Sequence, residues 1–153
     1  MRIEDILKLN SSIPLSKSVV VNILYTSGFI NSGLNQLLKP KDISLQQFNV
    51  LRILRGRKGN PATLSIIQER MINKMSNTTR LVDKLIKKEL VEKQINRINK
   101  RKVDINITTE GLNFLNQVDK LIDSKEVEIV SQLTDDEALE LIRLLGKLRL
   151  IAD

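Results

Sequence analysis

Two short segments in the middle of the chain alternate apolar and polar side chains with a period of two, in residues 90–95 and residues 102–107. The alternating residues are Val91, Lys93 and Ile95 in the first segment and Val103, Ile105 and Ile107 in the second. This period is typical of β-strands, and the Asn residues within 96–101 favour a turn between them. The pattern predicts a β-hairpin. Because the other apolar patterns have helical spacing, the expected fold class is mainly α with a small β-hairpin.

The chain before the hairpin is expected to contain one long helix followed by three short ones. Residues 16–39 form the long helix, and Pro40 ends it because its ring nitrogen cannot donate a hydrogen bond. Ser44 and Gln47 have the spacing of a capping box, which predicts that a second helix begins there and runs to about Gly56.

Thr63 is expected to cap the third helix, and Ser76 to cap a fourth that ends near Glu89. After the hairpin, residues 109–132 form a long helix, and a capping box at Thr134 opens the last one. Two short helices joined by a turn and followed by a hairpin predict a winged helix-turn-helix.

We therefore expect three parts: an N-terminal helical arm (1–40), a winged helix-turn-helix lobe (41–110) and C-terminal helices (111–153). The first and third parts hold more apolar residues than a small monomer can cover, which favours their dimerisation across a two-fold axis. An apolar helix stripe more commonly packs into its own domain, and this alternative stays open.

Positive charge is concentrated in residues 70–102, where eleven Lys or Arg stand against three Asp or Glu for a net charge of +8. The rest of the chain sums to −1. Such a concentration is typical of a face that binds a polyanion, although a solvated Lys-rich surface has the same composition. Aromatic residues make up only 3%, which argues against single-stranded nucleic acid.

The fourth helix and the hairpin tip carry the candidate DNA-binding residues. Small polar and bidentate side chains at the start of the helix can contact base edges or phosphates, and long cationic side chains at the tip can enter a minor groove. Each feature alone also fits an amphipathic helix or a solvated turn. The predicted DNA-binding residues are Ser76, Asn77, Thr79, Arg80, Lys84, Arg97, Lys100, Arg101 and Lys102.

Residues 67–111 resemble the MarR (multiple antibiotic resistance regulator) family. The similarity lies in the runs 67–71, 74–85 and 87–91, and in 99–111, where the family has an Asp-x-Arg wing signature and a strand leading into Leu-Thr-x-x-Gly. It implies a homodimeric transcriptional regulator, typically a repressor, that binds a palindromic operator in double-stranded DNA. It also implies that Thr79, Arg80 and Lys84 enter the major groove and that Arg101 enters the minor groove.

Two residues depart from the family pattern: Asn99 replaces an Asp that orients the wing Arg, and Glu89 replaces a Gly that ends the recognition helix. Many relatives respond to small phenolic or other amphipathic ligands, so a small-molecule effector is a further expected partner. Tyr25, Phe29 and Phe48 are candidates for lining its pocket, although aromatic residues at such spacing usually belong to the core.

The main alternative functions are an enzyme, a winged-helix protein–protein adaptor and a non-specific DNA-binding protein. The chain has no Cys and no His, which excludes disulfides, thiol sensing, zinc fingers and His-based acid–base catalysis. A Gly-rich phosphate loop is lacking, and the acidic run 135–137 is explained as a helix cap, so neither an enzyme nor a cofactor is expected. Since there is neither a secretory signal pattern nor a long apolar stretch, we expect a cytoplasmic protein without a membrane partner.

Overall fold

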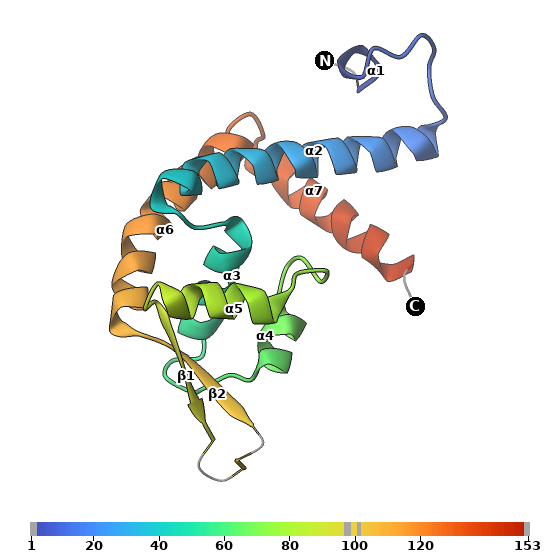
Figure 1. Ribbon diagram of the computed structural model, residues 1–153. Coiled ribbons are helices and arrows are strands. Elements are labelled where there is room, and N and C mark those ends of the chain that lie inside the picture. Colours follow the sequence, from blue (N-terminus) through green and yellow to red (C-terminus); the bar gives the residue numbers. More distant parts are fainter. Residues whose placement is uncertain (1–2, 97–98, 101, 152–153) are drawn as a thin grey trace.

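The computed structural model describes residues 3–96, 99–100 and 102–151. Over these residues the protein is mainly helical with one antiparallel hairpin (Figure 1), which confirms the fold class expected from the sequence. The elements in chain order are α1 (Ile3–Ile6), α2 (Leu15–Leu38), the 3₁₀ turn η1 (Lys39–Lys41), α3 (Leu45–Arg55), α4 (Leu64–Arg70), α5 (Thr78–Lys87), β1 (Val91–Ile95), β2 (Val103–Ile107), α6 (Thr109–Val130), α7 (Asp135–Leu148) and the 3₁₀ turn η2 (Arg149–Ile151).

Capping side chains determine where most of the helices begin. The capping box at the start of α3 is confirmed: the Gln47 N–H donates to Ser44 Oγ at 3.2 Å, and the Ser44 N–H donates to Gln47 Oε1 at 2.9 Å. The capping box at Thr134 opens α7, and the Thr63 hydroxyl caps α4. These bonds satisfy backbone N–H groups that have no partner inside their own helix.

The predicted start of α5 is wrong by one residue. Asn77 is the N-cap, because its Oδ1 accepts a hydrogen bond from the Arg80 N–H at 3.0 Å. Ser76 instead belongs to the preceding turn, where its N–H donates to the Asn73 carbonyl at 3.2 Å. The sequence also gave no indication of α1, a helix of four residues.

The hydrophobic core lies within the lobe, among α3, α4, α5 and the hairpin. Val50, Leu51, Ile67 and Leu85 are fully buried there. The C-terminal end of α2 and the part of α6 up to Ile122 close the core with a second set of buried side chains, which are Leu34, Leu38, Leu115, Val118 and Ile122. Burial of each such side chain stabilises the fold by about 1.5–3 kcal/mol, so α5 and the hairpin are held on a rigid support.

The hairpin, which we call the wing, is attached to the lobe at its base. Its strands pair from Val91 with Ile107 to Ile95 with Val103. Ala62, just before α4, extends this sheet by exchanging two hydrogen bonds with Ile105, at 2.9 and 2.8 Å. The wing therefore has a defined position relative to the helix-turn-helix.

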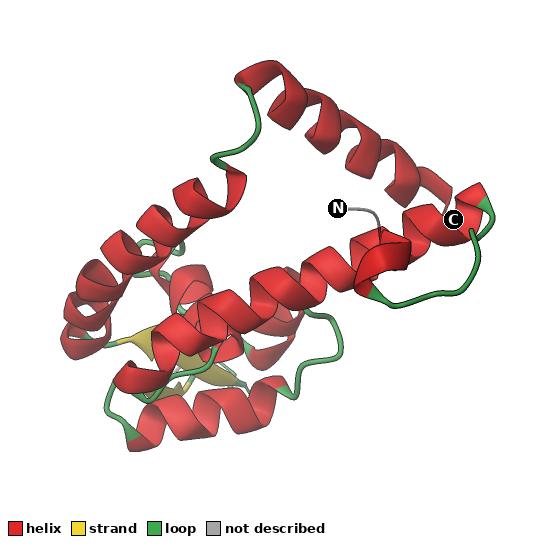
Figure 2. Cartoon of the chain, turned by 90° about the horizontal axis from the view of Figure 1, so that it is seen from above, coloured by secondary structure: helices red, strands yellow, loops and turns green. Residues whose placement is uncertain are grey.

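The N-terminal half of α2 and all of α7 extend away from the lobe (Figure 2). None of the residues of α7 is buried. Large apolar side chains are exposed on α2, at the end of α6 and on α7, including Leu15, Val20, Leu24, Phe29, Val127, Leu139 and Ile142. A single copy of the chain thus leaves much apolar surface on these helices uncovered.

Candidate nucleic-acid interface

Helix α5 has one face in the core and one in solvent. Val82 and Leu85 are buried, as is the polar Thr78 in the first turn. The opposite face consists of exposed polar side chains, which are Thr79, Arg80, Asp83, Lys84 and Lys87. The buried apolar residues hold the helix so that its cationic side chains point outward from the lobe.

Gln68 at the end of α4 holds the start of α5 in place. Its Oε1 accepts a hydrogen bond from the Thr78 hydroxyl, and its Nε2 donates to the Lys74 carbonyl at 2.8 Å. Neither Gln68 nor Thr78 was among the functional residues predicted from the sequence. Thr78 could have been found in the sequence, because it lies four residues before Val82 on the core-facing side of the helix. A polar residue at such a position indicates a buried hydrogen-bond partner.

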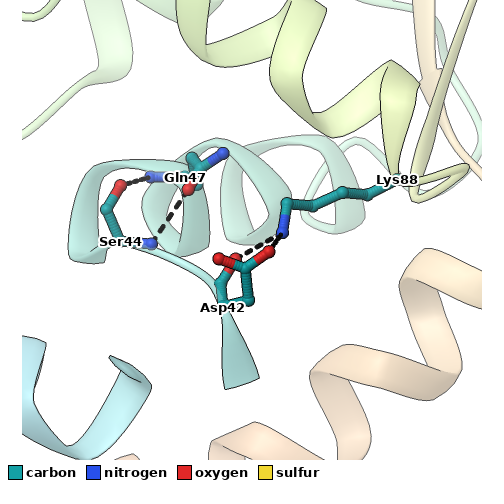
Figure 3. Close-up of polar contacts among 4 residues, drawn as sticks. All are labelled: Asp42, Ser44, Gln47 and Lys88. Atoms are coloured by element: carbon teal, nitrogen blue, oxygen red, sulfur yellow. Dashed lines mark hydrogen bonds and ion pairs between the residues drawn. The ribbon is translucent and has the colours of Figure 1, made fainter. Parts of the chain in front are cut away.

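The other end of α5 is held by an ion pair and a left-handed residue. The Lys88 ammonium binds both the carboxylate and the carbonyl oxygen of Asp42, just ahead of the capping box of α3 (Figure 3). This hydrogen bond and the positive charge lower the pKa of Asp42 below its usual value, and the charge of Lys84 adds to the effect. Glu89 follows with φ = 59°, so it adopts the left-handed conformation that the family pattern assigns to Gly.

The wing is braced by polar contacts on both sides. Within it, the Asn96 amide donates to both carboxylate oxygens of Asp104, at 3.1 and 2.9 Å. Toward α5, the Lys93 ammonium lies 3.5 Å from the Asp83 carboxylate. The Lys93–Asp83 pair connects α5 to the wing, and the Asn96–Asp104 bonds hold the wing together. None of these four residues was among the candidates predicted from the sequence.

The predicted DNA-binding residues fall into three groups. Asn77, Thr79, Arg80 and Lys84 are exposed on α5 or at its cap, and Lys100 and Lys102 are exposed on the wing. Ser76 is half-buried, and its hydroxyl has no hydrogen-bond partner among the residues that the structure describes. Arg97 and Arg101 lie outside the described residues.

Other kinds of site find little support in the described part of the chain. No group of three Asp or Glu residues there is arranged to hold a metal ion, and no helix there is long and apolar enough to cross a membrane. Of the three aromatic candidates for a ligand pocket, Phe48 is buried in the core, whereas Tyr25 and Phe29 are exposed on α2. The exposed face of α5 and the wing are therefore the main candidate site.

Comparison with known proteins gives a family for this fold. A model of the MarR family matches residues 43–103. Wild-type MarR from E. coli, in its apo form, is 30% identical, with a TM-score of 0.68 over 91% of this chain and 98% of its own. The chain belongs to the MarR family. The resemblance found in the sequence and the winged helix-turn-helix are thereby confirmed.

Two further similarities agree with this assignment. The HTH-type transcriptional regulator PecS of Dickeya dadantii (strain 3937) is 29% identical over 132 residues, which cover 84% of this MarR-family chain and 78% of PecS. The fold also matches that of S. aureus MepR, solved as a complex with DNA, with a TM-score of 0.76 and 20% identity over 88% of this chain and 96% of MepR. The protein is a transcriptional regulator with the DNA-binding fold of the MarR family.

Proposed function

We propose that this MarR-family protein is a homodimer that binds a palindromic operator and represses the adjacent gene. In this proposal residues 41–110 form the DNA-binding lobe, and residues 1–40 and 111–153 form the dimer interface. The observation that carries it is the exposed polar face of α5, which lies next to the wing within the segment of net charge +8.

The recognition helix supplies the base contacts in this proposal. Asn77, Thr79 and Arg80 lie at the N-terminal end of α5, the part of a recognition helix that reaches base edges in the major groove. Arg80 is suited to a bidentate contact with guanine and Lys84 to phosphate oxygens. The Ser76 hydroxyl is enclosed in the turn, so this predicted residue is proposed to support the start of α5 rather than to bind a phosphate through its hydroxyl. The wing residues Arg97, Lys100, Arg101 and Lys102 are proposed to bind the adjacent minor groove and its phosphates.

The second copy is needed because the outer helices lack a core of their own. Helix α7 has 14 residues and no buried side chain, and an isolated helix of this length is marginal in water. Exposed apolar residues on α2 and α7 provide the surface that a two-fold partner would cover, among them Phe29 and Ile142, at 66% and 64% exposed. Two lobes placed by such a dimer can bind two half-sites one helical turn apart.

The proposal also includes a small-molecule effector, and one surface hollow supports it. An open hollow of about 610 Å³ lies where α2 meets α3, and Asp42 is in its lining. Because Asp42 also binds Lys88, directly after the recognition helix, a ligand that displaced this carboxylate would release that end of α5. Release of bound duplex by small aromatic acids, measured by fluorescence anisotropy, tests this part separately.

The central test is the affinity for duplexes selected from a randomised pool with the full-length protein. We expect nanomolar binding to one palindromic sequence at about 150 mM salt, at least about 1,000-fold tighter than to random DNA. Equal weak binding to every duplex would contradict the proposal and favour an adaptor or a non-specific DNA-binding protein. Sedimentation of the free protein as a monomer would contradict the dimer.

Arg80→Ala tests the proposed contact between Arg80 and a base. It should weaken binding to the selected duplex about 5- to 150-fold while leaving random DNA less affected. Lys41→Ala removes one exposed positive charge outside both α5 with the wing and the proposed dimer interface, and it serves as the control. If both variants lose affinity equally, Arg80 does not make the proposed contact.

Repression is tested separately with a reporter gene placed behind the selected operator. Expression of the reporter should increase when the gene for this protein is deleted.

A further inference from the structure

Two apolar side chains are unusually exposed on the turn between α4 and α5. Met75 is 92% exposed and Ile72 is 87% exposed, the highest values for large hydrophobic residues in the described part of the chain. Single exposed apolar residues are common on protein surfaces. These two lie within four residues of each other, however, and they belong to the lobe rather than to the helices that form the proposed dimer interface.

The backbone of this turn is held by hydrogen bonds with polar side chains. The Ile72 N–H donates to Asn49 Oδ1, and the Met75 N–H donates to Asn73 Oδ1, both at 3.0 Å. The Gln68 amide donates to the Lys74 carbonyl at 2.8 Å. With its backbone tied to α3 and α4, the turn cannot fold its apolar side chains into the core, so they remain presented to solvent.

The surroundings of this apolar pair are polar and cationic. Met75 lies two residues before the cap Asn77, and Arg80 follows within the first turn of α5. Arg70, which precedes the pair, and Lys74, which lies between its two members in the chain, add exposed cationic side chains. A partner for this surface must therefore combine negative charge with small apolar groups. Duplex DNA does so, because the 5-methyl group of thymine is the apolar feature of the major groove.

We propose that Met75 and Ile72 contact thymine methyl groups in the major groove and so select thymine beside the bases that Arg80 contacts. This inference rests on the operator binding proposed above and adds a second determinant of sequence preference. Arg80 recognises a base by hydrogen bonds, whereas the apolar pair recognises the absence or presence of a methyl group.

The test uses the best duplex from the selected pool, with each thymine replaced in turn by deoxyuridine, which removes only the methyl group. Burial of one methyl group corresponds to about fourfold in affinity, so each contacted thymine should show about a fourfold loss. Met75→Gln keeps the side-chain length and makes its end polar, and it should abolish the difference between thymine and deoxyuridine at the contacted position. Met75→Leu keeps the side chain apolar and should preserve that difference. Ile72→Ala is compared in the same way.

The outcomes separate this inference from the proposed function. If no duplex is selected from the pool, operator binding itself fails. If a duplex is selected but no deoxyuridine substitution weakens binding, or Met75→Gln weakens the thymine and deoxyuridine duplexes equally, the methyl contact is overturned. Unchanged DNA binding by Met75→Gln also overturns it and favours a protein partner for this surface. Both side chains are exposed, so equal unfolding midpoints of the variants will show that the fold is intact.

Discussion

Substitution of Gly111 by Ala should destabilise the protein and disturb the wing. Gly111 lies in the first turn of α6, where this helix passes close to the chain entering β1. An added Cβ would lie 2.2 Å from the Leu90 carbonyl oxygen and 2.7 Å from Ile107 Cγ1. Since Cβ atoms essentially never approach other atoms closer than 3.0 Å, the Leu90 oxygen must move by at least about 0.8 Å.

The Leu90 carbonyl oxygen has little freedom to move. It is a backbone atom that accepts a hydrogen bond from the Thr108 N–H at 3.1 Å, and Leu90 directly precedes β1. Loss of this hydrogen bond costs about 1 kcal/mol, and overpacking adds about 1–3 kcal/mol. We therefore expect Gly111→Ala to lower the free energy of unfolding by about 2–4 kcal/mol and to reduce DNA affinity, because the wing moves with Leu90.

Urea unfolding followed by circular dichroism measures this change, at one fixed protein concentration because a dimer's stability depends on it. Gly56→Ala at the end of α3, outside the proposed dimer interface, is the matched control. Gly56 has φ = −62°, which Ala adopts readily, and its added Cβ would meet the Arg52 and Ile53 carbonyl oxygens at 3.4 and 3.5 Å, so the free energy of unfolding should change by less than about 0.5 kcal/mol. A Gly111→Ala protein within about 0.5 kcal/mol of wild type would refute the steric argument.

Two further predictions concern the ends of α5. Asn77→Ala removes the helix cap and should lower the free energy of unfolding by about 1 kcal/mol in the same urea assay. Ser76→Ala should change it by less than about 0.5 kcal/mol, because the Ser76 hydroxyl has no partner among the described residues. A larger loss for Ser76→Ala than for Asn77→Ala would show that Ser76 is the cap. Asp42→Asn tests the ion pair with Lys88. Because the pKa of Asp42 is lowered, the pair stabilises the fold at pH values above the usual carboxyl pKa, and this contribution is lost as the pH falls through the lowered pKa. The unfolding curves of the variant and the wild type should therefore differ at neutral pH and converge in acid. A difference that persists unchanged in acid would show that the carboxylate charge is not its cause.

Much of the fold follows from patterns confined to neighbouring residues. The capping boxes at Ser44 and Thr134 are present as predicted, since both partners of each bond lie three residues apart and the geometry of one helical turn brings them together. The period of two in residues 90–95 and 102–107 likewise predicted both strands of the wing, each to within one residue.

The precise start of α5 was less certain from local sequence, because Ser76 and Asn77 are both good capping residues. The choice depends on how the turn before the helix is folded, and this turn is held by Asn49 and Gln68 from other helices. Asn49 and Gln68 hold this turn from other helices, and such a role produces no periodic pattern in the sequence by which it could be predicted.

Apart from the four-residue α1, the sequence by itself determined the kinds of element, their order and the family, because helix caps, strand alternation and the recognition-helix motif each lie within a short stretch of chain. Only the tertiary structure decided that Lys88 binds Asp42, 46 residues away, that Thr78 binds Gln68, and that Ile72 and Met75 remain exposed. Such contacts depend on the packing of the whole core, which brings distant residues together and which no local period records.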